Sequence, residues 1–202
     1  LPEQHFFIAN ELKLQGVQPV TVAPRFIGEF QKGIDYIGEL PAFERDFAVH
    51  AAIADHFGYK LSIHSGSDKF SVFPTIGQYT HGHFHLKTAG TSWLEAMAVV
   101  AEHAPALYRE IHDFILPDAF YEATKYYHVT TNLNNIPPLD SVPDEALVTL
   151  LETNNDERQL VHITYGLILN EKALDGSYRF RDRLYKVWRQ YDKEYMQRLE
   201  RH

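Results

Sequence analysis

The sequence contains no cysteine. The chain therefore forms no disulfide, no thiolate metal site and no thiol nucleophile, so any chemistry must come from other side chains. This composition is compatible with a reducing compartment, and we expect the protein in the cytoplasm.

Long hydrophobic runs and basic clusters are also missing. No apolar stretch approaches the roughly 20 residues that span a bilayer, and the first residues, LPEQHFFIANELKL, lack the order of a signal peptide. The formal net charge is 19 − 27 = −8, without blocks of like charge, so we expect no binding to nucleic acid or to a membrane. A hydrophobic content of 45% predicts a folded core.

Several catalytic signatures are absent. The glycines at positions 28, 33 and 38 do not form GxGxxG, and the sequence has no GxxxxGK[ST], no GxSxG before a helix and no HExxH. Nucleotide binding therefore has no support, and a serine hydrolase is disfavoured.

Predicted helices and strands alternate along the first two thirds of the chain. Hydrophobic spacing, glycine stops and β-branched runs predict helices at 2–14, 40–57, 93–116, 141–152, 156–169 and 180–199, and strands at 17–24, 60–64, 83–90 and 125–133. The first helix is inferred from Phe6, Phe7, Leu12 and Leu14. The face predicted to be buried on the second consists of Phe43, Phe47, His50, Ala51 and Ala54.

Strands separated by helices indicate an α/β fold built of parallel βα units, either in a doubly wound sheet or in a (βα)8 barrel. The element order does not separate these two. We expect one α/β domain over residues 1–202 with helices at its carboxyl end.

Polar side chains follow the predicted strands at their carboxyl ends, where α/β proteins place their chemistry. Because side chains alternate along a strand, His64, Lys87 and His128 fall on one consistent parity. The segment after the first strand adds Arg25, Glu29, Lys32 and Asp35.

Imidazole and carboxylate groups from separate strands are ligands for a divalent metal, and Glu29, His64 and His128 would supply such a set. Their spacing is not a compact metal motif. Lys69 and Lys87 would hold an anion, since the glycine and serine around Lys69 leave backbone amides accessible.

Three long segments, VAPRFIGEFQKGIDYIG, HAAIADHFGYKLSIHSGSDKF and HFHLKTAGTSWLEA, resemble the tagaturonate epimerase family, and YYHVTTNL and QLVHITYGLIL also fit. The resemblance covers essentially the whole chain, which is similar to the carboxyl-terminal half of longer members. It implies half of a barrel-like, TIM-barrel-type α/β fold. It also implies a divalent-metal-dependent epimerase that interconverts D-tagaturonate and D-fructuronate, with zinc, manganese, cobalt or nickel as plausible metals.

The resemblance carries the family motifs over to residues of this chain. On the chemistry of those residues we expect three catalytic groups, Glu29, Asp68 and Lys87, and three metal ligands, Glu29, His64 and His128. We expect substrate contacts from Arg25, Lys32, Asp35, Ser65, Lys69 and Thr88.

Two other functions stay open from the sequence. One is a metal-dependent aldose–ketose isomerase of the same barrel type, and the other is a non-catalytic sugar-acid-binding module. We expect a small sugar acid as the ligand, although the sequence leaves the choice between uronates and neutral ketohexoses open. A half-barrel would associate with a second copy or with an amino-terminal half.

Overall fold

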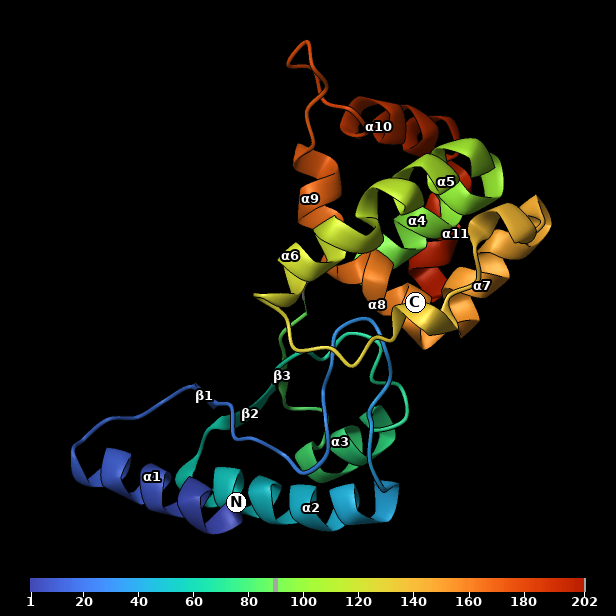
Figure 1. Cartoon of the computed structure of the whole chain (residues 1–202). Helices are drawn as coiled ribbons and strands as arrows, with labels where there is room; N and C mark the ends of the chain where they lie inside the picture. The colour runs from blue at the N-terminus through green and yellow to red at the C-terminus, as the bar shows by residue number, and fades with distance from the viewer. Residues whose placement is uncertain (89–90, 202) are drawn as a thin grey trace. The chain divides into compact units, whose positions relative to one another are not determined.

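Three short strands pair in parallel in the computed structural model, which describes residues 1–88 and 91–201. They are β1 (Thr21–Val22), β2 (Lys60–Ile63) and β3 (His85–Leu86), in the spatial order β1-β2-β3 (Figure 1). Thr21 is paired with Lys60, and Ser62 with His85. Each parallel connection contains a helix, which confirms the predicted mixed α/β class.

The chain divides into two compact units. The first consists of Leu1–Gln31 and Asp35–Ala89, and the second of Lys32–Ile34 and Gly90–His202. The expectation of one domain over residues 1–202 stays a prediction.

The first unit holds the sheet together with α1 (Pro2–Leu14), α2 (Leu40–Phe57) and α3 (Phe73–Thr80). α2 packs beside α1 and α3 (Figure 1). The predicted buried face of α2 is confirmed, with Phe43, Phe47 and His50 each fully buried. Gly58 ends the helix in the left-handed conformation, φ 76°, where a residue without Cβ avoids strain. α3, which carries Pro74 and Gly77 within eight residues, was not predicted.

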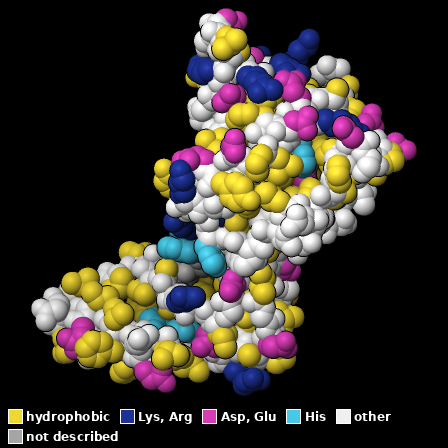
Figure 2. Space-filling model, viewed as in Figure 1, with side chains coloured by type: hydrophobic (Ala, Val, Ile, Leu, Met, Phe, Trp, Pro, Cys, Tyr) yellow, Lys and Arg dark blue, Asp and Glu magenta, His cyan; other side chains and the backbone are white. Residues whose placement is uncertain are grey.

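The hydrophobic side chains from which α1 was predicted do not form the buried face of the helix. The helix has the predicted bounds, but it buries His5 and Ala9, while Phe7 is 63% and Leu14 is 69% exposed. Hydrophobic side chains therefore reach the surface over α1 (Figure 2). The helical spacing of hydrophobic residues therefore predicted the position of α1 correctly, but it predicted the wrong residues for the face that packs against the rest of the unit.

The second unit is helical in its described residues. Its helices are α4 (Thr91–His103), α5 (Pro105–Phe114), a π-turn (Ile115–Ala119), α6 (Phe120–Thr124), α7 (Leu147–Thr153), α8 (Asn155–Ile163), α9 (Tyr165–Asn170), α10 (Arg181–Gln190) and α11 (Asp192–Arg201). Three short 3-10 turns (Leu133–Asn135, Leu139–Ser141 and Asp144–Ala146) lie between α6 and α7.

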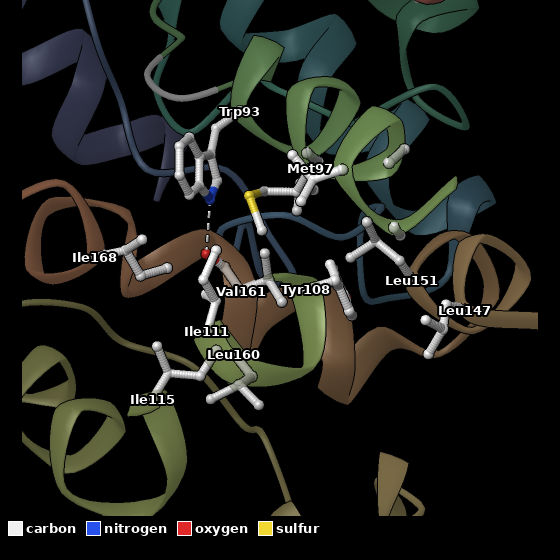
Figure 3. Close-up of a cluster of buried hydrophobic side chains, with 14 of the residues drawn as sticks. Trp93, Met97, Tyr108, Ile111, Ile115, Leu147, Leu151, Leu160, Val161 and Ile168 are labelled. Atoms are coloured by element: carbon white, nitrogen blue, oxygen red, sulfur yellow. Dashed lines mark hydrogen bonds between the residues drawn. The ribbon is translucent and has the colours of Figure 1, made fainter. Parts of the chain in front are cut away.

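The core of this unit forms around Met97 and Tyr108, with Leu147 and Leu160 packed into the same cluster (Figure 3). The indole of Trp93 donates a hydrogen bond of 2.9 Å to the carbonyl of Val161, which satisfies its polar group inside the cluster. α4 and α8 are thereby joined.

Three predicted long helices are each broken in two. The breaks fall at Ala104 before Pro105, at Thr164, and at Tyr191. Proline is tolerated in the first turn of a helix and not in its interior, which explains the first break.

The predicted strand at 125–133 is wrong. α6 ends at Thr124, and the backbone beyond it is bound by side chains of α8 instead of by a strand. Asn132 donates its amide hydrogen to Asp156 at 2.7 Å, and the hydroxyl of Thr131 donates to Gln159 at 2.9 Å. The last two positions of the predicted strand at 83–90 lie outside the described residues. Among those described, no helix has the length and apolar character needed to cross a membrane.

Candidate functional site

The loop His64–Phe70 follows β2 directly, and we call it the strand-end loop. His64 is exposed, whereas Ser67, Asp68 and Lys69 are buried. Ser65 and Asp68 have positive φ values of 52° and 60°. This left-handed backbone costs free energy in residues other than glycine, although aspartate tolerates it better than most, so the fold holds the loop in a defined conformation.

Gly66 brings the strand-end loop against β3. Its amide donates to the carbonyl of Lys87 at 3.1 Å, and the amide of Lys87 donates to Ile63 at 2.9 Å. A Cβ on Gly66 would lie 2.2 Å from the side chain of Leu86, so a larger residue there would force Leu86 to move. His64 and Lys87 therefore follow neighbouring parallel strands, as predicted. The side chains of Lys87 and Thr88 are exposed.

Lys69 ties the strand-end loop to the preceding loop. Its side chain is fully buried, and its ammonium donates to the carbonyls of Gln31 at 2.8 Å and Ser67 at 2.9 Å. A buried ammonium needs such acceptors because its desolvation is costly. The contact with substrate predicted for Lys69 stays a prediction. The burial was not foreseen, because a lysine in a serine- and glycine-rich loop resembles a surface residue.

The loop after β1 holds Glu29 in place. The amide and carbonyl of Glu29 form reciprocal hydrogen bonds with Ile37, at 2.9 and 3.1 Å. The ring of Tyr36 lies across Gly28 and Gly38, where added Cβ atoms would lie 2.2 and 2.4 Å from its hydroxyl. The half-buried Glu29 carboxylate accepts a hydrogen bond from the side chain of Gln31 at 2.5 Å. The loop is therefore built to fix Glu29.

Asp35 joins the loop of Glu29 to Ser71, the residue that directly follows the strand-end loop. Its carboxylate accepts from the backbone amide of Ser71 at 3.1 Å and from the Ser71 hydroxyl at 2.9 Å. Arg25, at the start of this loop, is exposed. Sequence reasoning named Asp35 but missed Gln31 and Ser71, although each lies in or beside a family motif.

The remaining predicted site residues belong to the second unit. The carbonyl of Lys32 accepts from the side chain of Gln159 at 3.2 Å, and that of Gly33 accepts from Arg158 at 2.8 Å. His128 is exposed in the segment after α6. The structure therefore places Arg25, Glu29, Asp35, His64, Ser65, Asp68, Lys69, Lys87 and Thr88 in the first unit, and Lys32 and His128 in the second.

The donor types of the predicted metal site suit a divalent cation, but the described residues contain no group of three or more histidine, aspartate and glutamate side chains positioned to hold one. The metal site stays a prediction.

A cavity of about 630 Å³ lies in the first unit, away from the strand-end loop. Val20, Lys60 and His83 line it, so it opens at the amino ends of the strands. Chemistry in parallel α/β folds belongs to the carboxyl ends, where the candidate site lies.

The fold and the site define a mixed α/β protein whose parallel strands present fixed, polar loops at their carboxyl ends. The chain belongs to the tagaturonate epimerase family, because the sequence model of that family matches residues 1–202. This confirms the resemblance inferred from the sequence motifs.

Two relatives illustrate the extent of the match. The tagaturonate/fructuronate epimerase of Thermotoga maritima is 45% identical over all 202 residues, which correspond to 40% of that protein. The native crystal structure of the fructuronate-tagaturonate epimerase UxaE from Cohnella laeviribosi is 58% identical, with a TM-score of 0.96, over 100% of this chain and 41% of that one. A two-glycerol complex of that protein has a TM-score of 0.94. The chain thus spans about two fifths of the length of these relatives.

Proposed function

We propose that this chain supplies the strand-end site of an epimerase that interconverts D-tagaturonate and D-fructuronate. The relatives carry this activity in their names, and the chain is similar to them over its whole length. Two contacts carry the proposal: Lys69 of the strand-end loop binds the loop of Glu29, and Asp35 of the Glu29 loop binds Ser71, which directly follows the strand-end loop. These contacts hold the Glu29 carboxylate beside the polar loops at the carboxyl ends of the parallel strands. We further propose that the three strands belong to a TIM-barrel-like sheet.

The reaction inverts the carbon β to the ketone, whose proton the carbonyl does not acidify. Retro-aldol chemistry solves this problem. A base removes the hydroxyl proton at the β carbon, the bond between the α and β carbons breaks, and its electron pair moves into the α carbon to give an enediolate. The aldehyde fragment rotates, and re-addition with return of the proton forms the other epimer.

Glu29 and Asp68 are the candidate bases in this scheme. Glu29 is half-buried and fixed through its backbone, while Asp68 is buried in a strained loop. Lys87 and Arg25 are exposed cations that would bind the substrate carboxylate. Lys32, Asp35, Ser65, Lys69 and Thr88 complete the proposed set that orients the sugar.

We also propose a divalent metal cofactor, zinc, manganese, cobalt or nickel, with Glu29, His64 and His128 as ligands. When bound, such an ion would polarise the ketone and offset negative charge on the cleaved fragment. Elemental analysis of the purified protein tests this. We expect about one metal per chain, lost in His64→Ala and retained in His83→Ala. Equal metal content in both variants would remove His64 from the ligand set.

Product analysis tests the proposed reaction. Incubation with D-tagaturonate or D-fructuronate, followed by NMR, should give the same mixture of the two from either side. An aldose product would instead indicate a ketose–aldose isomerase. Saturable binding without turnover would indicate a sugar-acid-binding module.

We propose that the exposed hydrophobic face of α1 packs against further polypeptide, either a second copy or a segment equivalent to the rest of the longer relatives. In the described residues, β1 and β3 also have one strand neighbour each, and open edges favour pairing. Light scattering should give a mass above that of one chain, reduced by Phe7→Ser. A monomer that binds no amino-terminal segment of the Cohnella relative would contradict this.

A further inference from the structure

The second unit contains a pocket of about 310 Å³ that the proposed reaction does not use. It is lined by Tyr126 and Tyr127 after α6, Tyr165 at the start of α9, and the polar side chains of Glu122 and Asn170. Its volume falls at the lower end of the range for small-ligand pockets, about 300 to 1,000 Å³. It is large enough for one monosaccharide-sized molecule.

Two family motifs meet in this pocket. YYHVTTNL contributes Tyr126 and Tyr127, and QLVHITYGLIL contributes Tyr165, although they are separated by almost 40 residues of sequence. The end of α6 at Thr124 makes this possible, because the segment that was predicted as a strand instead leaves the helix at the pocket. The aromatic side chains of these motifs do not contribute to the proposed reaction.

The lining combines flat aromatic surface with hydrogen-bonding groups. The ring of Tyr126 is 78% exposed, so a large aromatic surface faces solvent. Burial, and after it the neighbouring Tyr165 phenol, raise the pKa of Tyr127, and the hydroxyls of these two tyrosines are hydrogen-bonding groups of the lining. The side-chain amide of Asn170 donates a hydrogen bond of 2.7 Å to the backbone carbonyl of Gly166, which fixes the orientation of the Asn170 side chain. Aromatic faces suit the C–H face of a sugar ring, and these polar groups suit its hydroxyls.

The charge of the pocket selects among sugars. Glu122 lines it, and the nearby ammonium of Lys125 is paired with that carboxylate. Among the described residues that line the pocket there is no lysine, arginine or histidine, so a ligand carboxylate or phosphate would lie beside Glu122 without a cation of the lining to bind it. A neutral ligand avoids this repulsion.

We propose that the pocket of Tyr126, Tyr127 and Tyr165 binds a neutral pyranose. The ring stacks on Tyr126, and the hydroxyls bind the phenols, Glu122 and Asn170. This site goes beyond the proposed epimerase reaction, because binding here needs neither a metal nor turnover.

Methyl β-D-galactopyranoside is a suitable probe, since a glycoside cannot open to a keto sugar and cannot be turned over. Saturation-transfer NMR and titration should show saturable binding with a Kd of the order of 1 to 10 mM. Tyr126→Ala should weaken binding about tenfold, because the stacking surface is lost. Tyr121→Ala removes an exposed tyrosine of α6 outside the pocket lining and should leave binding unchanged.

The matching methyl uronoside tests the charge argument. It should bind more weakly than the neutral glycoside, and Glu122→Gln should narrow the difference. No saturable binding to the unmodified chain, equal binding by Tyr126→Ala, or preference for the uronoside would each overturn the proposal. Unchanged circular dichroism establishes that the variants are folded. Because the probe is not a substrate, a failure of the epimerase assay would leave this result intact.

Discussion

Each unit buries a hydrogen-bonded trio of polar side chains, and the two trios differ in the group at their centre. In the first unit, which has an imidazole trio, His5 lies between Tyr59 at 2.6 Å and His50 at 2.8 Å. In the second, a carboxylate trio, Glu157 accepts from Tyr108 at 2.6 Å and from His112 at 3.0 Å. The members of both trios are at least nine-tenths buried.

The hydrogen bonds of the imidazole trio allow one consistent direction. If Tyr59 donates to Nε2 of His5, then Nδ1 of His5 donates to Nδ1 of His50, and Nε2 of His50 carries the hydrogen that faces Asp46 at 3.6 Å. The reverse direction would point a bare nitrogen at a carboxylate. An added proton on Nδ1 of His50 would set two N–H groups against each other, and one on Nε2 of His5 would displace the hydrogen bond donated by Tyr59.

The carboxylate trio needs no unprotonated nitrogen. Glu157 is an acceptor only, and it lies in the first turn of α8, where the Asn154 side chain caps the helix and the helix dipole favours negative charge. Burial, and then Glu157 itself, hold the pKa of Tyr108 well above its usual value, so that phenol stays a donor. Protonation of an imidazole therefore disrupts the hydrogen bonds of the first trio. The hydrogen bonds of the second trio depend on the negative charge of its central carboxylate.

Removing the central carboxylate should have the largest effect. Glu157→Ala leaves the Tyr108 hydroxyl and His112 without their buried acceptor and opens a cavity, so we expect a loss of about 4 kcal/mol in unfolding free energy. Urea denaturation measures this. The exposed Glu152→Ala on α7 serves as the control, with a loss below about 1 kcal/mol. A loss that small in Glu157→Ala would show that the trio contributes little.

Acid should destabilise the imidazole trio next most strongly. Burial, and then His50, lower the pKa of His5 from 6.5 to about 4, and burial lowers that of His50. Between pH 6.5 and about 4 the unfolded chain binds a proton at His5 that the folded chain does not, so stability falls as pH falls, by about 1.4 kcal/mol per pH unit.

Denaturation at several pH values, for the unmodified chain and for His5→Gln, isolates this contribution. The variant should lose less stability between pH 6.5 and 4, whereas the exposed His83→Gln should keep the original slope. Identical slopes in the unmodified chain and His5→Gln would contradict the assignment.

The two tyrosines provide the finest comparison. Tyr108→Phe removes a hydrogen bond to a charged group and should cost about 2 kcal/mol, while Tyr59→Phe removes a neutral one and should cost about 1 kcal/mol. Thermal and urea unfolding at neutral pH measure both, with the exposed Tyr121→Phe as a control. An equal or reversed order would mean that charge does not distinguish the trios.

In the first unit, α1, α2 and the three strands were predictable as elements, whereas α3 and the packed face of α1 were not. The spacing of Phe43 and Phe47 gave the buried face of α2, and strand parity placed His64 and Lys87 at neighbouring strand ends. The prediction failed at 125–133, where aromatic and β-branched residues resemble a strand but Asp156 binds the backbone instead. A contact between residues 24 positions apart leaves no local periodic signal.

The chemistry of the candidate site was predictable in residue type and not in environment. Glu29, Asp35 and Lys69 were named from motifs, but one of the carbonyls that accept from Lys69 belongs to Gln31, 38 residues earlier in the chain. Backbone carbonyls carry no sequence signature. The ties that fix Glu29 therefore became visible only in the folded chain.

The central claim is that Glu29 acts in the epimerisation of a ketohexuronate. The most direct measurement is the rate at which D-tagaturonate becomes D-fructuronate, followed by NMR for Glu29→Gln and for Glu11→Gln, an exposed control on α1. We predict a rate at least about 100-fold lower in Glu29→Gln and an unchanged rate in the control. Equal rates in the two variants would contradict the account.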